Sequence, residues 1–536
     1  MKKLKLVCVA IAMACATPTL AGGLLTNTNQ HVAFDRMMSR EASIGIDGVY
    51  YNPAGVVFMS EGHHLAINWQ LAFQTRTINN DYALFTNNAN NPITPRDFKG
   101  TAFAPVIPSF QYAYNKGKWS FQASFALTGG GGKCTFDDGL GSFEKIVAET
   151  AIAACGLAGV VDQTLGNTLG QPGMEMFTSD QAFGKTGKYS FNSYMHGRQY
   201  YYGLSVGAAY KFCDNFSAFL GVRGVYALTN YYGYVENINV GNMPLYKVLD
   251  PTKESSANIE LSCDQSGVGF TPIIGVDYKT GRWNFSAKYE FKTRIRLKNK
   301  SVNQTPSIGN LPANLANQMT GILTAKYQQA GLPLEQAKQQ AENTTNAVLN
   351  DPTVGATMMG LKTQFDQKLN KAIGEYEDGK KIAGDIPAYL ALGVGYRPVD
   401  AVRVNVGFHW FDDKNATSYN NRNKELKRGT LEYNAGVEVD VNKKITLSTG
   451  WQNTNYGLSD EYMDDKSFVV SSNSVAIGGV YHINKKMDLN VAYFHTFYQH
   501  KKTTEKVQLT ADISRNYSSD YTRNNNVFAV GLDINF

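Results

Sequence analysis

The chain ends with the segment NVFAVGLDINF, residues 526–536, and this stretch decides the fold. Apolar residues occupy every second position from Phe528 to Phe536, and small or polar residues stand between them. Successive side chains of a strand point to opposite faces, so the segment predicts a ribbon with one apolar and one polar face. Its length matches the roughly 9–11 residues with which a tilted strand crosses a bilayer.

The same alternation recurs along the chain and predicts about fourteen strands. The connections alternate strictly between short turns, such as Asn442-Lys443, and long loops. Transmembrane β-barrels sort their connections in this way, with turns on the periplasmic side and loops outside, whereas a soluble sandwich has no reason to do so. The predicted strands are 63–79, 105–115, 117–129, 199–211, 216–233, 268–279, 282–298, 386–397, 402–413, 428–441, 444–457, 472–483, 487–500 and 526–536. We therefore predict an all-β, antiparallel transmembrane barrel.

The composition agrees with export to a membrane. A hydrophobic content of 43% and a mean hydropathy of -0.30 are too low for a helical membrane bundle. The one long apolar run, Leu4 to Ala16, follows a cluster of lysines, and residues 1–21 are predicted to be a cleaved secretory signal. Cleavage removes three lysines and lowers the formal net charge from +6 to +3. Such a chain lacks the cationic surface of a nucleic-acid-binding protein.

The reactive side chains indicate neither an enzyme nor a metal site. After cleavage four cysteines remain, and Cys134 and Cys155 fall in one predicted loop. An oxidising compartment permits a disulfide between them. No CxxC motif or Cys/His cluster is present, so we expect no metal and no cofactor. The 8 histidines have no serine, cysteine or paired carboxylate at a diagnostic spacing, which argues against an enzyme.

Two of the long loops contain predicted helices. They lie at 142–169 and within 311–376, inside extracellular insertions near 130–198 and 299–385. One interpretation is that these helices pack on each other and cap the barrel. The other is that their apolar sides form a surface to which hydrophobic substrates first bind. The two interpretations are compatible with each other.

The segment before the first strand is predicted to plug the barrel. Residues 22–60 do not alternate, and a lumen of about fourteen strands is too wide for its own side chains to fill. Within this segment Asn52-Pro53-Ala54-Gly55 predicts a firm turn, because proline fixes its φ and asparagine tolerates unusual backbone angles. We expect a hatch at 22–60 and a barrel at 61–536.

Several motifs carry a family resemblance. They are Arg36, Ser39-Arg40-Glu41, Asp47, Tyr51 to Gly55, Val106 to Phe110, Trp119 to Leu127, Gly129 to Gly132, Gly436-Val437-Glu438, Thr449-Gly450-Trp451 and the final Phe536. With these residues the chain resembles the FadL family, the long-chain fatty acid and hydrocarbon transporters of Gram-negative outer membranes. The Asn-Pro-Ala block in its N-terminal context is the specific part of this resemblance.

The resemblance implies a mechanism. The family has a fourteen-stranded barrel blocked by an N-terminal hatch. Substrate is captured among extracellular loops and passes to a hydrophobic pocket; the hatch then shifts, and a kink in the third strand lets the ligand leave sideways into the membrane. By resemblance the hatch residues are Arg36, Asp47, Asn52, Pro53, Ala54 and Gly55. The chain departs from the family at Phe34-Asp35-Arg36, where glycine often precedes the arginine, and in its large insertions after strands three and seven.

The predicted strand 282–298 suggests where a carboxylate would bind. Its polar face, which includes Lys288, Glu290, Arg294 and Arg296, is expected to line the lumen. Arginine binds carboxylates bidentately, so Arg294 and Arg296 near the outer rim are predicted to attract the headgroup of a fatty acid. The alternatives are a luminal salt-bridge ladder with Glu290 or with acidic residues of the hatch, or basic residues that meet anionic lipopolysaccharide.

The apolar side chains of the hatch are candidates for contact with the tail. Methionine adapts to varied ligands, and aromatic rings offer large apolar surfaces. The alternative is that these side chains only fasten the hatch to the barrel. The candidates are Phe34, Met37, Met38, Tyr50 and Tyr51.

These observations predict a monomeric outer-membrane transporter of a Gram-negative bacterium. It would take up hydrophobic compounds such as long-chain fatty acids passively, with ligand gating, and would contact outer-membrane lipid and lipopolysaccharide. The rival functions are a diffusion porin for small polar solutes, which leaves residues 22–60 without a role, and a surface adhesin that binds through its helical insertions.

Overall fold

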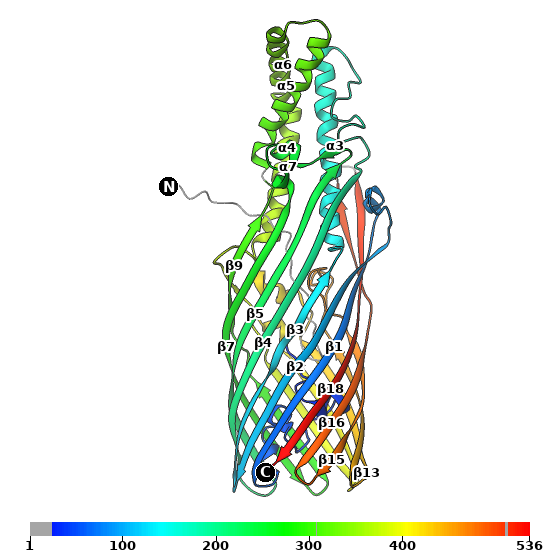
Figure 1. Ribbon diagram of the computed structural model, residues 1–536. Helices are drawn as coiled ribbons and strands as arrows, with labels where there is room; N and C mark the ends of the chain where they lie inside the picture. The colour runs from blue at the N-terminus through cyan, green and yellow to red at the C-terminus, as the bar shows by residue number, and fades with distance from the viewer. Residues whose placement is uncertain (1–23, 307, 510–512) are drawn as a thin grey trace.

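The chain forms a closed antiparallel barrel of fourteen strands in a computed structural model that describes residues 24–306, 308–509 and 513–536 (Figure 1). Strand β18 (Ser514–Asn535) pairs with β1 (Gly62–Tyr82) from His64↔Asn535 to Tyr82↔Tyr517 and closes the wall. The predicted fold class is confirmed. The predicted signal segment, 1–21, lies outside the described residues.

Some strands of the wall are built from two pieces. Both β8 and β9 pair with β7, both β16 and β17 pair with β18, and the short β10 precedes β11. A further short strand, β6 (Met243–Pro244), only extends the edge of β5. The strands of the wall are β1, β2 (Arg96–Lys116), β3 (Trp119–Phe136), β4 (Tyr189–Lys211), β5 (Phe216–Val240), β7 (Ile259–Thr280), β8 with β9 (Trp283–Glu290, Arg296–Gln304), β10 with β11 (Lys381–Ala383, Tyr389–Val399), β12 (Val402–Phe411), β13 (Thr430–Asn442), β14 (Ile445–Asn455), β15 (Ser472–Asn484), β16 with β17 (Met487–Tyr498, Lys501–Gln508) and β18.

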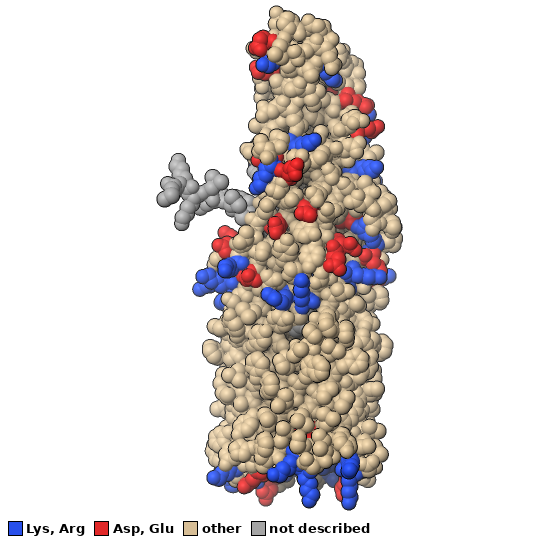
Figure 2. Space-filling model, in the orientation of Figure 1, with Lys and Arg blue, Asp and Glu red and all other residues tan. Residues whose placement is uncertain are grey.

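The outer wall is suited to lipid. Apolar side chains such as Leu220 and Phe270 point outward and are 69% and 70% exposed, while polar side chains alternate with them toward the lumen. In Figure 2, charged atoms gather at the lower rim and below the helices, and a broad band between these two levels carries almost none. This pattern is typical of a barrel that is surrounded by hydrocarbon over the middle of its height.

Helices from three loops stand above one end of the barrel (Figure 1). We call this group, α3 to α7, the tower. Helix α3 ends at Leu169 and is followed by Gly170, whose φ of 65° suits a glycine after the last helical turn. Helix α3 packs on α6 and α7, and α4 on α5, around one large buried apolar core. The helices are α3 (Gly141–Leu169), α4 (Tyr246–Leu249), α5 (Leu311–Gln329), α6 (Leu334–Leu349) and α7 (Pro352–Ile373); short 3-10 turns are η2 (Ala83–Asn87), η3 (Glu254–Ala257), η4 (Ile308–Asn310), η5 (Asp413–Asn415) and η6 (Tyr419–Glu425).

Candidate functional site

The N-terminal segment folds inside the barrel. It contains α1 (Val32–Met37), α2 (Gly48–Tyr51) and the 3-10 turn η1 (Gly55–Phe58), drawn in dark blue within the lower lumen of Figure 1. We call residues 24–60 the hatch. Apart from Ile44 and Gly45, residues 26–57 are buried. A segment with so many buried polar groups needs partners on the wall, and the structure supplies them.

Three arginines converge on one carboxylate of the wall. Arg36 of the hatch forms an ion pair with Glu438 of β13. The Nη1 atom of Arg40 donates to the other oxygen of Glu438 at 3.0 Å, and Arg403 of β12 lies 3.2 Å from it. Arg40 also binds Asp47 through two hydrogen bonds of 2.7 and 3.1 Å. Arg36, Arg40, Asp47 and Glu438 are buried and Arg403 is half-buried, so the hatch is held by a network whose charges neutralise one another.

A histidine forms a second ionic contact between the hatch and the wall. The Nε2 atom of His409 lies 2.7 Å from Glu41 Oε1, and its Nδ1 atom lies 2.8 Å from Glu432 Oε2. All three side chains are buried. Each ring nitrogen faces a carboxyl oxygen, one from the hatch and one from β13, so the His409 ring bridges the hatch to the wall.

The predicted Asn-Pro-Ala-Gly turn lies at the base of the hatch. Asn52 donates from Nδ2 to Asp277 of β7 at 2.6 Å, and its Oδ1 accepts from the Gly55 amide at 3.1 Å. A Cβ atom at Gly55 would lie 2.3 Å from Asn52 Nδ2. The turn therefore requires glycine at this position.

The next two residues of the turn bind the wall through their backbone. Gln122 of β3 donates to the carbonyl oxygen of Pro53, and Ser217 of β5 donates to that of Ala54, both at 2.7 Å. Each residue of the motif therefore forms a hydrogen bond either within the turn or with the barrel wall. Arg36 and Asp47, the other predicted hatch residues, lie in the arginine network. Their part in gating stays a prediction.

Four of the five predicted tail-contact residues belong to one apolar cluster. Phe34 and Tyr51 stack with ring centroids 5.3 Å apart, and Tyr50 meets Tyr51 edge-on. We call this group the hatch cluster: Phe34, Met38, Tyr50, Tyr51, Ala72, Ala104, Ile107, Leu127, Ala476, Phe494 and Val527, with Tyr200 and Tyr202 beside it. Met37 lies outside this cluster, and its backbone packs against Gly436 and Gly450. A Cβ atom added to either glycine would lie 2.1 or 1.7 Å, respectively, from the carbonyl oxygen of Met37.

The barrel wall is interrupted beside the hatch cluster. Strands β2 and β3 pair between residues 100–103 and 133–136, and again between 109–116 and 119–126. Residues 104–108 and 127–132 show no β2–β3 pairing in the described chain. Pro105 and Pro108 lack the N–H that a ladder needs, and Gly130 has a φ of 72° that is foreign to a strand. We call this interruption the lateral gap.

The start of the hatch covers the inner side of the lateral gap. The Asn27 amide donates to Thr128 O at 2.9 Å, and its side chain donates to Gly130 O at 2.6 Å. A Cβ atom added to Gly129 would lie only 2.3 Å from the carbonyl oxygen of Leu25, so the hatch backbone packs directly on this glycine. Ala104, Ile107 and Leu127 of the hatch cluster flank the same gap. Sequence reasoning missed Asn27, because the polar run at 26–30 has no spacing that distinguishes it from a loop.

The prediction that Arg294 and Arg296 line the lumen is wrong. Both side chains are exposed on the outer face, whereas Ile295 and Leu297 are buried at 0% and 4% exposure. The inward positions are Lys288 and Glu290 before residue 291 but Thr293 and Ile295 after it. The break between β8 and β9 thus shifts the alternation by one residue, and a shift of one residue exchanges the two faces.

The luminal part of that strand instead forms an ion-pair ladder. Arg223 of β5 binds both oxygens of Glu290 at 2.6 and 3.0 Å, and Lys288 lies 2.9 Å from the same carboxylate. The Lys288 ammonium also donates to the backbone oxygen of Tyr50 at 2.6 Å and lies 3.9 Å from the centre of its ring. Arg223 and Lys288 are therefore paired with groups of the wall and the hatch. This agrees with the alternative prediction of a luminal salt-bridge ladder that includes Glu290.

The predicted Cys134–Cys155 disulfide is absent. Both cysteines are free, as are Cys213 and Cys263, in the described chain. Cys134 is buried on β3, and Cys155 lies near the middle of α3. The Cys155 thiol instead donates to the carbonyl oxygen of Phe183 at 3.4 Å. Within the described residues no group of three His, Cys, Asp or Glu side chains is placed to hold a metal.

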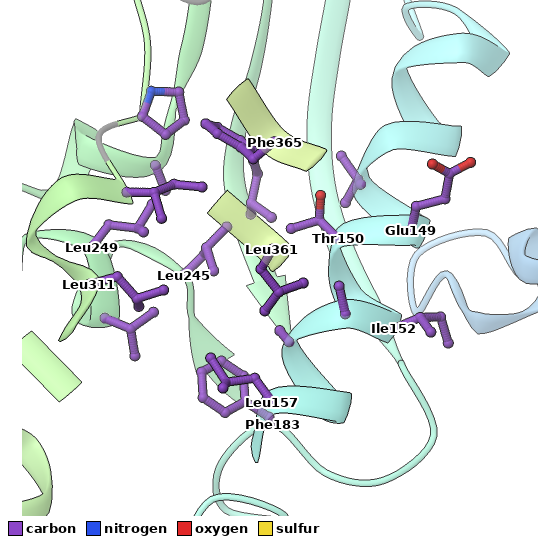
Figure 3. A pocket seen from close by; sticks show the side chains of 18 of the residues that line it. Glu149, Thr150, Ile152, Leu157, Phe183, Leu245, Leu249, Leu311, Leu361 and Phe365 are labelled. Carbon is purple, nitrogen blue, oxygen red and sulfur yellow. The ribbon is translucent and has the colours of Figure 1, made fainter. Parts of the chain in front are cut away.

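The tower encloses an apolar cavity of about 190 Å³. Figure 3 shows leucine and phenylalanine side chains from α3, α4, α5 and α7 directed toward one another around it. The labelled lining residues include Leu157, Phe183, Leu245, Leu249, Leu311, Leu361 and Phe365. The helices both pack on each other and leave an apolar space, so the structure is compatible with both interpretations of the insertions.

An acidic side chain links the tower end of the barrel to the hatch. Asp413 of η5 accepts a hydrogen bond from the Leu24 amide at 3.3 Å. It also accepts from the amide and hydroxyl of Thr430 at 2.9 and 2.5 Å. Burial raises the pKa of Asp413 to about 6, and the hydrogen bonds from Thr430 and Leu24 oppose this rise.

No protein-family model and no curated protein matches this sequence. Solved structures share its fold. A FadL homologue of Pseudomonas aeruginosa is 13% identical, with a TM-score of 0.58 over 96% of this chain and 100% of that chain. The toluene transporter TodX of Pseudomonas putida is 13% identical, with a TM-score of 0.46 over 98% and 100%. The toluene transporter TbuX of Ralstonia pickettii is 13% identical, with a TM-score of 0.44 over 92% and 94%. The first likeness shows that the chain has a FadL-like fold.

Proposed function

We propose that the chain is a non-enzymatic outer-membrane channel that takes up hydrophobic compounds and releases them sideways into the membrane. One observation carries this proposal: the lumen is closed by the hatch, while the wall is interrupted at the lateral gap beside an apolar cluster. A porin for polar solutes would need the reverse arrangement, with an open lumen and a continuous wall.

The route follows the apolar surfaces. A hydrophobic compound leaves water for the cavity in the tower, because burial of apolar area is favourable. It then reaches the hatch cluster, where Phe34, Met38 and Tyr51 offer an apolar surface that methionine can reshape. Displacement of Asn27 from the β3 carbonyls, and of the Leu25 carbonyl from Gly129, opens the lateral gap to lipid. Long-chain fatty acids are the cargo that the family resemblance implies.

The test restores the missing strand pairing. Pro105 and Pro108 are replaced by valine, so that β2 regains two backbone donors toward β3. Pro272→Val is the matched control, since Pro272 lies outward on β7 away from the gap. We expect uptake of a radiolabelled long-chain fatty acid by intact cells to fall several-fold in the double variant and to persist in the control. Unchanged uptake, or a large steady conductance of the purified wild-type protein in a planar bilayer, would overturn the proposal.

A deletion distinguishes the proposed channel from the alternative function, a surface adhesin. Removal of residues 311–376 takes away the whole of α5, α6 and α7. A channel that uses the tower for capture loses uptake at low cargo concentration, whereas an adhesin loses cell attachment with uptake unchanged.

A further inference from the structure

The outer face of β9 carries a row of cations. Arg294, just before β9, and Arg296, Lys298 and Lys300 on it are exposed, while the residues between them are buried. Successive outward side chains of a strand stand roughly 7 Å apart. We call these four residues the β9 row.

The β9 row begins where the lipid-facing surface of the same strand ends. Trp283, Phe285 and Phe291 point outward and are 44%, 40% and 42% exposed. The stretch from Trp283 to Phe291 is about as long as the 9–11 residues that cross a bilayer. Beyond it the outer face changes from aromatic to cationic. Figure 2 shows charged side chains at this level, below the base of the tower.

The protein neutralises only part of this charge. Arg296 pairs with the buried Asp385 at 2.8 Å, and Lys300 stands opposite Asp264 in the β7–β9 register. Lys298, in contrast, stands opposite Lys381 of β10. Like charges in directly opposed positions of two strands repel each other. Within the described residues neither Lys298 nor Arg294 forms an ion pair.

We propose that the β9 row, together with Lys381, binds the phosphate groups of an anionic glycolipid in the outer leaflet, of the lipopolysaccharide class. A phosphate between Lys298 and Lys381 relieves their repulsion, and Arg294 is able to bind a second phosphate bidentately. The cargo of the channel is not the ligand, because these side chains point away from the lumen. The inference rests on the proposed membrane location but not on the transported compound.

The test compares two sets of three substitutions. Arg294→Gln, Lys298→Gln and Lys300→Gln remove charge from the row and leave the Arg296–Asp385 pair intact. Lys443→Gln, Lys444→Gln and Lys485→Gln form the control, because they remove three exposed lysines from turns at the opposite end of the barrel. Purified proteins are titrated with lipopolysaccharide and with its enzymatically dephosphorylated form, and bound lipid is counted by native mass spectrometry.

We expect the wild type and the control to bind the phosphorylated glycolipid, and the row variant to bind it roughly tenfold more weakly or worse. Equal affinity of the row variant and the wild type, or equal binding of the dephosphorylated lipid, would overturn the proposal. The heat-modifiable mobility of each barrel on gels reports folding. Should the row variant not fold, Lys298→Gln and Lys381→Gln are compared singly in the same titration. A wild-type protein that binds the glycolipid but takes up no cargo would refute the proposed channel and leave this inference standing.

Discussion

Arg40 of the hatch donates a hydrogen bond of 3.0 Å to Glu438 of β13, so a residue near the start of the chain is fixed to one near its end. Glu438 also forms ion pairs with Arg36 and Arg403, so this one carboxylate contacts three guanidinium groups. Two further carboxylates complete the charge balance: Asp47 pairs with Arg40, and Asp440 pairs with Arg403. A network of this kind is sensitive to the loss of its central member.

Glu438→Gln is expected to loosen the hatch. Removing one partner of a buried ion pair costs about 3–5 kcal/mol, because the remaining charges are left without compensation. Leak current through single channels in a planar bilayer should rise, while the barrel still folds through its ladder. Asp440→Asn is the control, since Asp440 binds Arg403 but no hatch residue in the described chain. Equal leak in the two variants contradicts the assigned role of Glu438.

Replacement of Asn52-Pro53-Ala54 by three glycines should raise the leak in another way. It removes the Asn52–Asp277 hydrogen bond and frees a backbone that proline had restricted, at a cost of about 1–3 kcal/mol to the ordered hatch. The same measurement applies, with fatty acid uptake recorded in parallel. Three glycines at 484–486, in a turn remote from the hatch, provide the control. If conductance and uptake both remain at wild-type values, the turn does not govern gating.

The tower cavity should determine affinity for cargo rather than maximal rate. Leu361→Asp and Phe365→Asp place charge against an apolar space, and we expect half-saturation of uptake to move to a several-fold higher cargo concentration. Met359→Asp is a matched control on the same helix, because Met359 is 72% exposed and does not line the cavity. An equal effect of all three substitutions would mean that charge on the tower, and not the cavity, is responsible.

Stability should fall as the pH rises through the titration of Asp413. Its pKa lies above the ordinary value of 3.8, at about 6, so the folded chain holds this proton more tightly than the unfolded chain does. The folded state therefore carries no penalty below pH 4, loses stability between pH 4 and 6, and is destabilised by on the order of 3 kcal/mol above that range. Melting temperatures from pH 4 to 8 are compared for the wild type and Asp413→Asn, which removes this component. Asp400→Asn serves as the control, because Asp400 has a 99% exposed side chain in the turn between β11 and β12. Identical pH profiles for Asp413→Asn and the wild type would show that the site does not titrate as described.

The membrane-crossing parts of the strands were the most predictable elements. Residues 526–536 alternate because one face meets lipid and the other the lumen, and they lie in β18 as predicted, apart from the final residue. The strands run further than predicted on the tower side: β4 begins at Tyr189 rather than near 199, and β18 at Ser514. Outside lipid both faces of a strand can be polar, so the periodic signal disappears while the hydrogen bonds continue.

The site was predictable only where a local motif carries it. The Asn-Pro-Ala-Gly turn is such a motif, and its glycine is explained by the close approach of Asn52. The partners Glu438 and Asp277 are more than 200 residues away along the chain, and no local pattern reveals them. The error at Arg294 and Arg296 has a single cause. The irregular segment 291–295 between β8 and β9 shifts the alternation by one residue and reverses the faces, and the composition of the strand does not show where such a break occurs.

The length of the wall has a consequence at the cell surface. β5 is 25 residues long, and at about 3.3 Å per residue even a tilted strand of that length far exceeds a hydrocarbon thickness of about 30 Å. In the proposed membrane orientation the extended wall therefore lifts the tower and the mouth of the channel well away from the lipid surface (Figure 1). Because the helices of the tower stand farthest from the membrane, they are the first part of the protein that phages, antibodies and proteases meet. The tower is therefore under selection that is unrelated to transport.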